Sequence, residues 1–191
     1  MERNVDMTEI SDGKRYTSND LAKLGCGDCA GCSKCCHGMG ESITLDPYDI
    51  YNLTINLKMT FNELLAESLG LSVKDMIILP HLNLKAEGEG CLFLDENGRC
   101  SIHSFRPGIC RLFPLGRIYE NESFSYFLQI NECVKQNRTK VKIKKWLGIP
   151  NLAAYENYIN TWHYFLKNMK AFLEEQDNEE MSKKINVYIL K

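Results

Sequence analysis

The chain has 191 residues, which is enough for one domain with a sizeable hydrophobic core. Its 23 Lys and Arg nearly balance its 25 Asp and Glu, so the net charge of -2 gives no global attraction to nucleic acid or to an anionic membrane. No signal peptide and no run of about 20 apolar residues is visible in the sequence. We therefore expect a cytoplasmic protein with no nucleic-acid partner and no membrane partner.

The sequence divides into three parts by composition. Residues 1–25 are polar and contain the turn-forming strings SDG and TSND, which predict a loosely attached N-terminal arm. The cysteine-rich loop CGDCAGCSKCCHG follows, and we expect a cysteine-cluster domain over residues 26–175 that includes a covering helix. Residues 176–191 are expected to form a tail.

Two short helices are predicted after the cysteine-rich loop. The first begins at Asp46, a good N-cap that precedes a proline, and continues to Leu57. The second begins at the capping box formed by Thr60 and Glu63 and ends at Gly70. Both helices present apolar residues at three- and four-residue spacing, so each has one face for the core.

Two β-hairpins are predicted in the middle of the chain. The pair Asn97 and Gly98 lies between two apolar runs, which indicates a hairpin over residues 91–103. A second hairpin, over residues 116–130, is expected to turn near Asn121.

The clearest predicted element is a long helix near the C-terminus. Apolar and aromatic residues recur at helical spacing from Leu152 to Leu173, so this helix is expected to cover the domain. Residues 75–85 are expected to be extended and broken at Pro80. The predicted fold is therefore mostly α with short β-hairpins, an irregular α+β domain that is centred on metal and capped by the long C-terminal helix.

Nine cysteines are the most unusual feature of the composition. A disulfide framework is excluded because the count is odd and the cytosol keeps thiols reduced. Closely spaced thiolates repel one another, and a bound cation removes that conflict. A Cys-x-x-Cys turn points two sulfurs the same way, so the first loop predicts metal ligation. The first loop contributes Cys26, Cys29, Cys32, Cys35 and Cys36, and the remaining four are Cys91, Cys100, Cys110 and Cys133.

The later cysteines are dispersed, which constrains how they share a metal ion. In a regular hairpin Cys91 and Cys100 would lie roughly 13 Å apart, too far for one ion to bind both. Either the hairpin is irregular, or the two thiols serve different sites that cysteines of the first loop complete. Eight ligands in two groups of four is the simplest arrangement, with at least one group mixed between the two regions.

The spacing leaves the identity of the metal open. Cys26, Cys29, Cys32 and Cys36 match the C-x2-C-x2-C-x3-C pattern of bacterial iron-sulfur proteins, although His37 stands where that pattern has proline. Tetrahedral zinc takes the same thiolate ligands. Zinc, iron and a 4Fe-4S cluster are the cofactors that remain.

Two blocks together resemble a known family. The strings CAGCSKCC (residues 29–36) and CLFLDENGRCSIHSFRPGICRLFP (residues 91–114) are similar in this order to the CxxCxxCC family, described as a zinc- or iron-chelating domain. The resemblance covers roughly residues 26–135. It implies a metal-binding role for every cysteine except Cys26, which is an addition to the family pattern, and Cys133 carries no local motif of its own.

The same resemblance implies a second kind of function. The family includes proteins similar to flagellin lysine N-methylases, which implies S-adenosylmethionine as methyl donor and a protein as substrate. The chain contains no Gly-rich strand-to-helix turn of the type that binds this cofactor in common methyltransferases. The leading hypothesis is thus a protein whose partners are metal ions. A lysine methylase and a zinc-stabilised interaction module with a protein partner are the alternatives, so it stays open whether the chain is an enzyme.

Two arginines near the later cysteines have two interpretations. Arg106 and Arg111 would either tune the metal site and hold an anionic substrate, or form structural salt bridges to residues such as Asp95 or Asp46.

Overall fold

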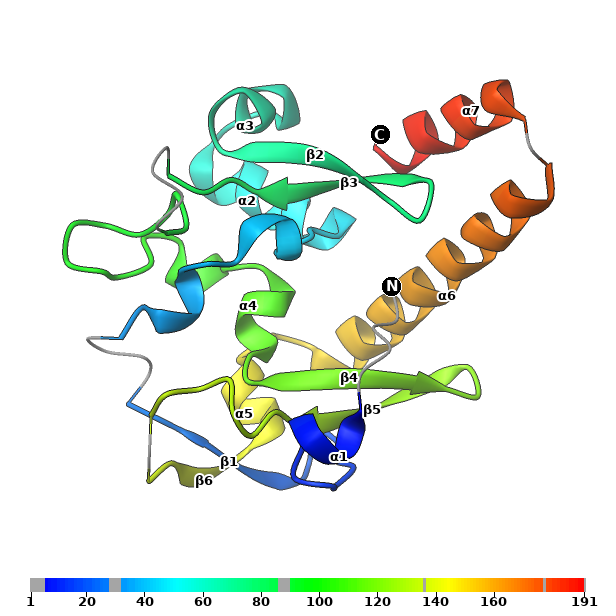
Figure 1. The fold of residues 1–191 in the computed structure, drawn as a ribbon. Helices are drawn as coiled ribbons and strands as arrows, with labels where there is room; N and C mark the ends of the chain where they lie inside the picture. The colour runs from blue at the N-terminus through cyan, green and yellow to red at the C-terminus, as the bar shows by residue number, and fades with distance from the viewer. Residues whose placement is uncertain (1–5, 28–31, 86–89, 136, 177, 191) are drawn as a thin grey trace.

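In the computed structural model, shown as a ribbon in Figure 1, the described residues are 6–27, 32–85, 90–135, 137–176 and 178–190. Seven α-helices and three two-stranded antiparallel sheets make up this part of the chain, which confirms the predicted irregular α+β class. The helices are α1 (Met7–Ile10), α2 (Pro47–Leu57), α3 (Phe61–Glu67), α4 (Gly108–Leu112), α5 (Ile143–Leu147), α6 (Leu152–Gln176) and α7 (Glu179–Ile189). The strands are β1 (Leu21–Gly25), β2 (Leu69–Lys74), β3 (Ile77–Leu82), β4 (Leu115–Glu120), β5 (Ser123–Leu128) and β6 (Thr139–Lys142). None of the described helices is long and apolar enough to cross a membrane.

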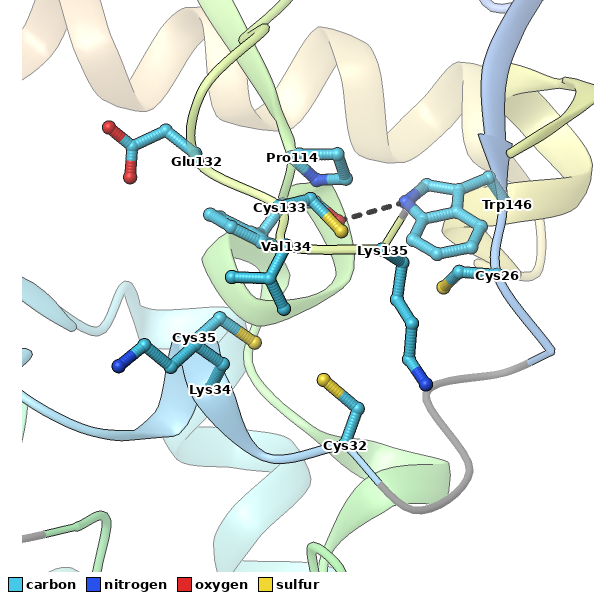
Figure 2. A pocket seen from close by; sticks show the side chains of 11 residues that line it. Cys26, Cys32, Lys34, Cys35, Pro114, Glu132, Cys133, Val134, Lys135 and Trp146 are labelled. Atoms are coloured by element: carbon cyan, nitrogen blue, oxygen red, sulfur yellow. Dashed lines mark hydrogen bonds between the residues drawn. The ribbon is translucent and has the colours of Figure 1, made fainter. Parts of the chain in front are cut away.

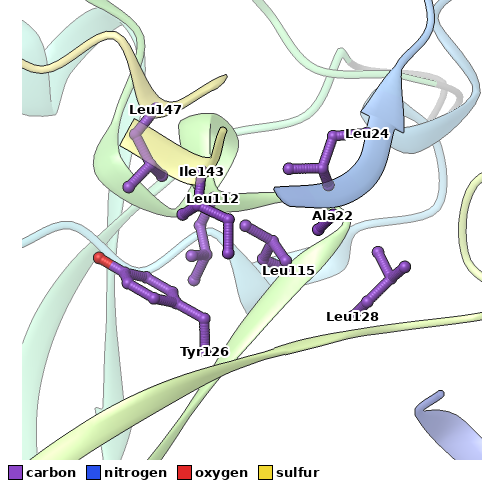
Figure 3. Close-up of a cluster of buried hydrophobic side chains, with 8 residues drawn as sticks. All are labelled: Ala22, Leu24, Leu112, Leu115, Tyr126, Leu128, Ile143 and Leu147. Atoms are coloured by element: carbon purple, nitrogen blue, oxygen red, sulfur yellow. The ribbon is translucent and has the colours of Figure 1, made fainter. Parts of the chain in front are cut away.

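The N-terminal segment is part of the fold. Strand β1 pairs with β6, more than half of the sequence away, and Tyr16 forms a bridge to Tyr126 of β5. Ala22 and Leu24 of β1 are buried in a cluster that also contains residues from α4, β4, β5 and α5 (Figure 3). The expectation of a loosely attached arm is therefore wrong for residues 6–25. Ala22 and Leu24, which alternate along β1, contact the core although residues 1–25 as a whole are mostly polar.

Helices α2 and α3 form where the local signals predict them. Asp46 caps α2 by accepting a hydrogen bond from the backbone N of Asp49, and Pro47 is the first helical residue. Thr60 and Glu63 form the predicted capping box of α3. This second helix ends at Glu67, earlier than predicted, because Gly70 already belongs to β2.

Strand β3 runs through Pro80 without a break, which corrects the predicted interruption. It pairs with β2, and the carbonyl of Pro80 accepts a hydrogen bond from Leu45 N at 2.8 Å. This carbonyl points away from β2, so the missing N–H of the proline removes nothing from the β2–β3 ladder. The two strands therefore form a continuous hairpin.

The two predicted hairpins have different outcomes. The hairpin predicted over residues 116–130 is the β4–β5 hairpin, whose strands pair from Leu115 to Leu128, and its turn at Asn121 and Glu122 has positive φ at both residues, as in a type I′ turn. The predicted turn at Asn97 and Gly98 exists, but no regular strands flank it; Leu94 and Cys100 make one isolated bridge. The separation of about 13 Å that a regular hairpin would impose on the two cysteines does not apply here.

The long helix α6 confirms the predicted covering element. It passes along the β4–β5 hairpin and leads to α7, which lies beside the β2–β3 hairpin (Figure 1). Asn186 of α7 accepts a hydrogen bond from Ile78 N at 2.6 Å and is buried. The described residues of the predicted tail therefore form a packed helix.

Candidate metal centre

One group of cysteines lines a pocket between the first loop and the segment that follows β5. The pocket-lining cysteines come from both ends of the family-like region: Cys26, Cys32, Cys35 and Cys133. Figure 2 shows their side chains around the opening, together with Lys34, Lys135 and Trp146. The cavity has a volume of about 20 Å³, which is room for one water molecule or a single metal ion.

The wall of this pocket is held by the indole of Trp146. Its Nε1 donates a hydrogen bond to the carbonyl of Phe113 at 3.1 Å, which ties α5 to the segment after α4. Sequence reasoning did not identify Trp146, Lys34 or Lys135 as neighbours of the cysteines. No sequence signal links Trp146 to the cysteines. Lys34 directly precedes Cys35, and Lys135 lies two residues after Cys133, so their positions in the sequence could have indicated them.

The other cysteines lie around the irregular segment 91–110. The backbone N of Cys91 donates to the carbonyl of Cys36 at 2.7 Å, so this segment begins against the first loop. Cys91, Cys100 and Cys110 all pack against one hydrophobic cluster, which contains Leu53, Leu64 and Ile102. Cys36, Cys91, Cys100 and Cys110 therefore form a second neighbourhood.

The thiols influence one another electrostatically. Cys35 and Cys36 share a side-chain hydrogen bond, which is the main reason why the pKa of Cys35 is lowered to about 7 and the pKa of Cys36 is raised. Burial raises the pKa of Cys110 well above its usual range, and the nearby Asp49, Cys91 and Cys100 raise it further. Thiolates in this arrangement would repel one another, and a bound divalent cation relieves that repulsion.

Burial also raises the pKa values of Cys91 and Cys100. Cys32, Cys35, Cys36, Cys91, Cys100, Cys110 and Cys133 are all thiols that form no disulfide. Soft thiolates are the ligands that zinc and iron share, so the chemistry of the donors fits either metal.

The ligand set is not complete among the described residues. In that part of the chain, no three Cys, His, Asp or Glu side chains converge closely enough to hold a metal ion. Cys29, a predicted ligand, lies outside the described residues. The described cysteines thus share two neighbourhoods without forming a finished coordination sphere.

The two arginines near Cys110 bond to the backbone. Arg111 donates from Nε to the carbonyl of Arg106 at 3.0 Å and from Nη2 to the carbonyl of Ser104 at 2.5 Å. Arg106 donates from Nη1 to the carbonyl of His103 at 2.8 Å. The predicted salt bridges to Asp95 or Asp46 are not found among the described residues, because these guanidinium groups bond to backbone carbonyls. These bonds fold the chain tightly just before Cys110.

Asp49 is a buried residue that the sequence analysis missed. Its Oδ1 accepts a hydrogen bond from the backbone N of Gly108 at 2.8 Å, two residues before Cys110. Burial and the adjacent Asp46 raise the pKa of Asp49 to about 8. The only sequence signal was its place three residues after the N-cap of α2, which indicates a capping residue and not a contact with a distant segment.

The comparisons with known proteins agree with the donor chemistry. The chain matches the CxxCxxCC family, described as a "putative zinc- or iron-chelating domain", over residues 28–145. No solved structure matches the chain. The match includes every cysteine except Cys26 and supports metal binding. Because it covers more than half of the sequence, this chain belongs to the CxxCxxCC family.

Proposed function

We propose that this protein binds zinc or iron through two groups of cysteine thiolates. The first group is Cys26, Cys32, Cys35 and Cys133, and the second is Cys36, Cys91, Cys100 and Cys110. The observation that carries the proposal is the shared pocket of the first group, since Cys133 comes from a distant part of the chain. Side chains that gather from remote segments and are all soft ligands are typical of a metal site. Cys29 is a further predicted ligand, and we assign it to neither group.

We also propose single ions and not an iron-sulfur cluster. The ferredoxin-like run is Cys26, Cys29, Cys32 and Cys36, but the pocket brings Cys26 and Cys32 together with Cys35, which is not a member of that run. The cavity of about 20 Å³ suits one ion. Both observations favour a mononuclear site completed by Cys35 and Cys133.

Metal and sulfide analysis of anaerobically purified protein tests this function. We expect about two zinc or iron ions per chain, from four thiolates per ion, and no acid-labile sulfide. Cys133→Ser and Cys110→Ser should each remove about one ion and leave the other in place. A brown protein with stoichiometric sulfide would contradict the mononuclear sites, and full metal content in both variants would contradict the assigned groups.

Removal of the metal should also destabilise the protein, because the binding energy of a structural site is part of the folding energy. Chelation is expected to lower the melting temperature and the far-UV circular dichroism signal. An unchanged melting temperature after verified metal loss would mean that the ions do not support the fold.

The lysine methylase and the interaction module remain predictions from the sequence. Retention of labelled S-adenosylmethionine by the metal-loaded protein would support the first. Surface substitutions that abolish partner capture without changing metal content would support the second.

A further inference from the structure

The helix that carries Cys110 has no side-chain cap at its N-terminus. Helix α4 has only five residues, and its N-cap position is Pro107, which makes no side-chain capping bond. A helix this short is not stable alone, and the N–H groups of its first turn need partners. Contacts from elsewhere in the fold must therefore hold α4 in place.

Asp49 supplies one of these contacts from α2. The hydrogen bond from Gly108 N to Asp49 Oδ1 is 2.8 Å long and joins the first residue of α4 to a side chain that is only 5% exposed. The carboxyl group takes the role that an N-cap side chain plays in other helices. Since Asp49 is itself fixed by the capping box at the start of α2, the position of α4 is tied to a rigid element.

Tyr155 supplies a second contact, from α6. A Cβ atom placed on Gly108 would lie 2.1 Å from the hydroxyl oxygen of Tyr155, so the ring packs against the backbone of α4 with no space for a side chain. Tyr155 is buried and belongs to a helix that lies beyond residues 28–145, the part matched by the family. Helix α6 therefore contacts the start of α4 directly.

We propose that Asp49 and Tyr155 are positioning residues that hold α4 so that Cys110 reaches its metal group. This inference rests on the proposed function, because Cys110 must be a ligand. It extends the metal centre beyond its cysteines: a carboxyl group of α2 and a phenol of the C-terminal helix determine where one ligand lies. Outer contacts of this kind commonly change metal affinity by about 10–100-fold when they are lost.

Two substitutions separate the hydrogen-bond acceptor of Asp49 from its charge. Asp49→Asn keeps an oxygen acceptor for Gly108 N but loses the second acceptor, which takes a hydrogen bond from Asp46 N at 3.3 Å, and Asp49→Leu removes both. Burial raises the pKa of Asp49 to about 8, so the neutral asparagine tests whether the acceptor for Gly108 N is sufficient without the negative charge. A matched control is Leu79→Ala, which removes a buried side chain from a different cluster, formed with Ile77 and Leu173.

The measurement is chelator competition on the protein loaded with Zn²⁺ or Co²⁺, with the thiolate-to-cobalt absorbance as a spectroscopic readout. Asp49→Leu should weaken the Cys110 group by about 10-fold or more and shift its cobalt spectrum, while the Cys133 group is unchanged. Asp49→Asn should stay within about threefold of the natural protein. If Asp49→Leu weakens metal binding no more than Leu79→Ala, the positioning role is wrong.

Tyr155 is tested by rescue. Gly108→Ala should weaken the Cys110 group because the new methyl group collides with the hydroxyl of Tyr155. Tyr155→Phe removes that hydroxyl, so the double variant should recover part of the lost affinity. A double variant that is as weak as Gly108→Ala alone would overturn the role of Tyr155.

Failure of the inference and failure of the proposed function give different results. If Cys110→Ser keeps all of its metal, Cys110 is not a ligand and the proposed function fails at that group. If Cys110→Ser loses an ion but Asp49→Leu and Gly108→Ala do not weaken binding, only the positioning role fails.

Discussion

Lys23 of β1 lies directly opposite Lys140 of β6 in the antiparallel register. Both side chains are exposed, and like charges at directly opposed positions of a sheet destabilise it. We expect Lys140→Glu to convert this repulsion into an attraction and to raise the free energy of unfolding by about 0.2–1 kcal/mol. Urea denaturation at low ionic strength measures the change.

The neighbouring Lys142 provides the control for this prediction. It is also exposed on β6, but its opposed residue is Leu21; because Lys142 is the N-cap of α5, where glutamate would be favoured by the helix dipole, the control substitution is the uncharged Lys142→Gln, which should have a smaller effect. High salt screens exposed charges and should reduce the gain from Lys140→Glu. Equal gains from both variants would show that overall charge, and not the opposed pair, is responsible.

The N-terminal strand should contribute strongly to stability. Leu24 is completely buried, and Leu24→Ala is expected to lower the free energy of unfolding by about 2–5 kcal/mol. Leu21, in the same strand but 52% exposed, serves as the control, and Leu21→Ala should have little effect. Thermal denaturation of both variants makes the comparison. Similar small losses would mean that β1 is only weakly attached.

The turn of the β4–β5 hairpin can be improved. Glu122 has a φ of 58°, a conformation that costs a residue with a side chain about 1 kcal/mol and costs glycine much less. The backbone carbonyl of Glu122 accepts a hydrogen bond from Asn160. Because this bond does not involve the Glu122 side chain, a substitution by glycine retains it. We expect Glu122→Gly to raise the melting temperature. Ser123→Gly, just inside β5, should lower it.

The buried carboxyl group of Asp49 should make stability depend on pH. Its pKa is raised to about 8 by burial first and by Asp46 second, whereas an unfolded Asp has a pKa of about 3.9. The folded state therefore binds this proton more tightly than the unfolded state does. The contribution of Asp49 to the free energy of unfolding is fully present below pH 4. It falls as the pH rises towards 8, by at most about 1.4 kcal/mol per pH unit.

Asp49→Asn removes this dependence. The difference in unfolding free energy between the variant and the natural protein should move in favour of the variant from pH 5 to pH 8.5, measured by urea denaturation of metal-free protein. The range ends at pH 8.5 because burial raises the pKa of Cys110 well above its usual range, so the loss of the Asp49 charge changes the titration of that thiol only at higher pH. The control is Asp20→Asn: bonds from Thr17 lower the pKa of the exposed Asp20, so its difference should be flat above pH 5. A flat difference for Asp49→Asn as well would show that this carboxyl group is ionised in the folded state.

Other charged groups surround Asp49 and share in this titration. Asp46 precedes α2, Arg117 lies on β4, Tyr155 lies on α6 and Cys110 lies on α4. Arg117 opposes the effect because its positive charge lowers the pKa of Asp49. A change of about 1.4 kcal/mol per pH unit in the free energy of unfolding is thus the upper limit for the one proton of Asp49.

Elements with local signals were predictable from the sequence, and elements that depend on distant partners were not. The caps at Asp46 and Thr60 act within four residues, so α2 and α3 were found where their signals lie. Strand β1 was missed because its partner is β6, and no local pattern encodes that pairing. A short polar segment and an edge strand have similar compositions.

The same limit applies to the cysteines. Spacing predicted thiolate ligands, and it could not decide whether Cys26 belongs with Cys36 or with Cys133. That choice depends on how residues 113–135 return to the first loop, which is a property of packing around Phe113 and Trp146. Asp49 was missed for a related reason, because its partner Gly108 lies 59 positions further along the chain.

The distance along the chain between the cysteines that line the pocket has a consequence for biosynthesis. Cys26, Cys32 and Cys35 leave the ribosome about 5–20 s before Cys133, at a translation rate of about 5–20 residues per second. During that interval the proposed group of Cys26, Cys32, Cys35 and Cys133 lacks its last member, and the early thiols are open to oxidation to sulfenic acid or to disulfides. If the proposed group binds a metal ion, its complete set of ligands forms late in synthesis, and the nascent chain is most vulnerable to oxidants before Cys133 has been made.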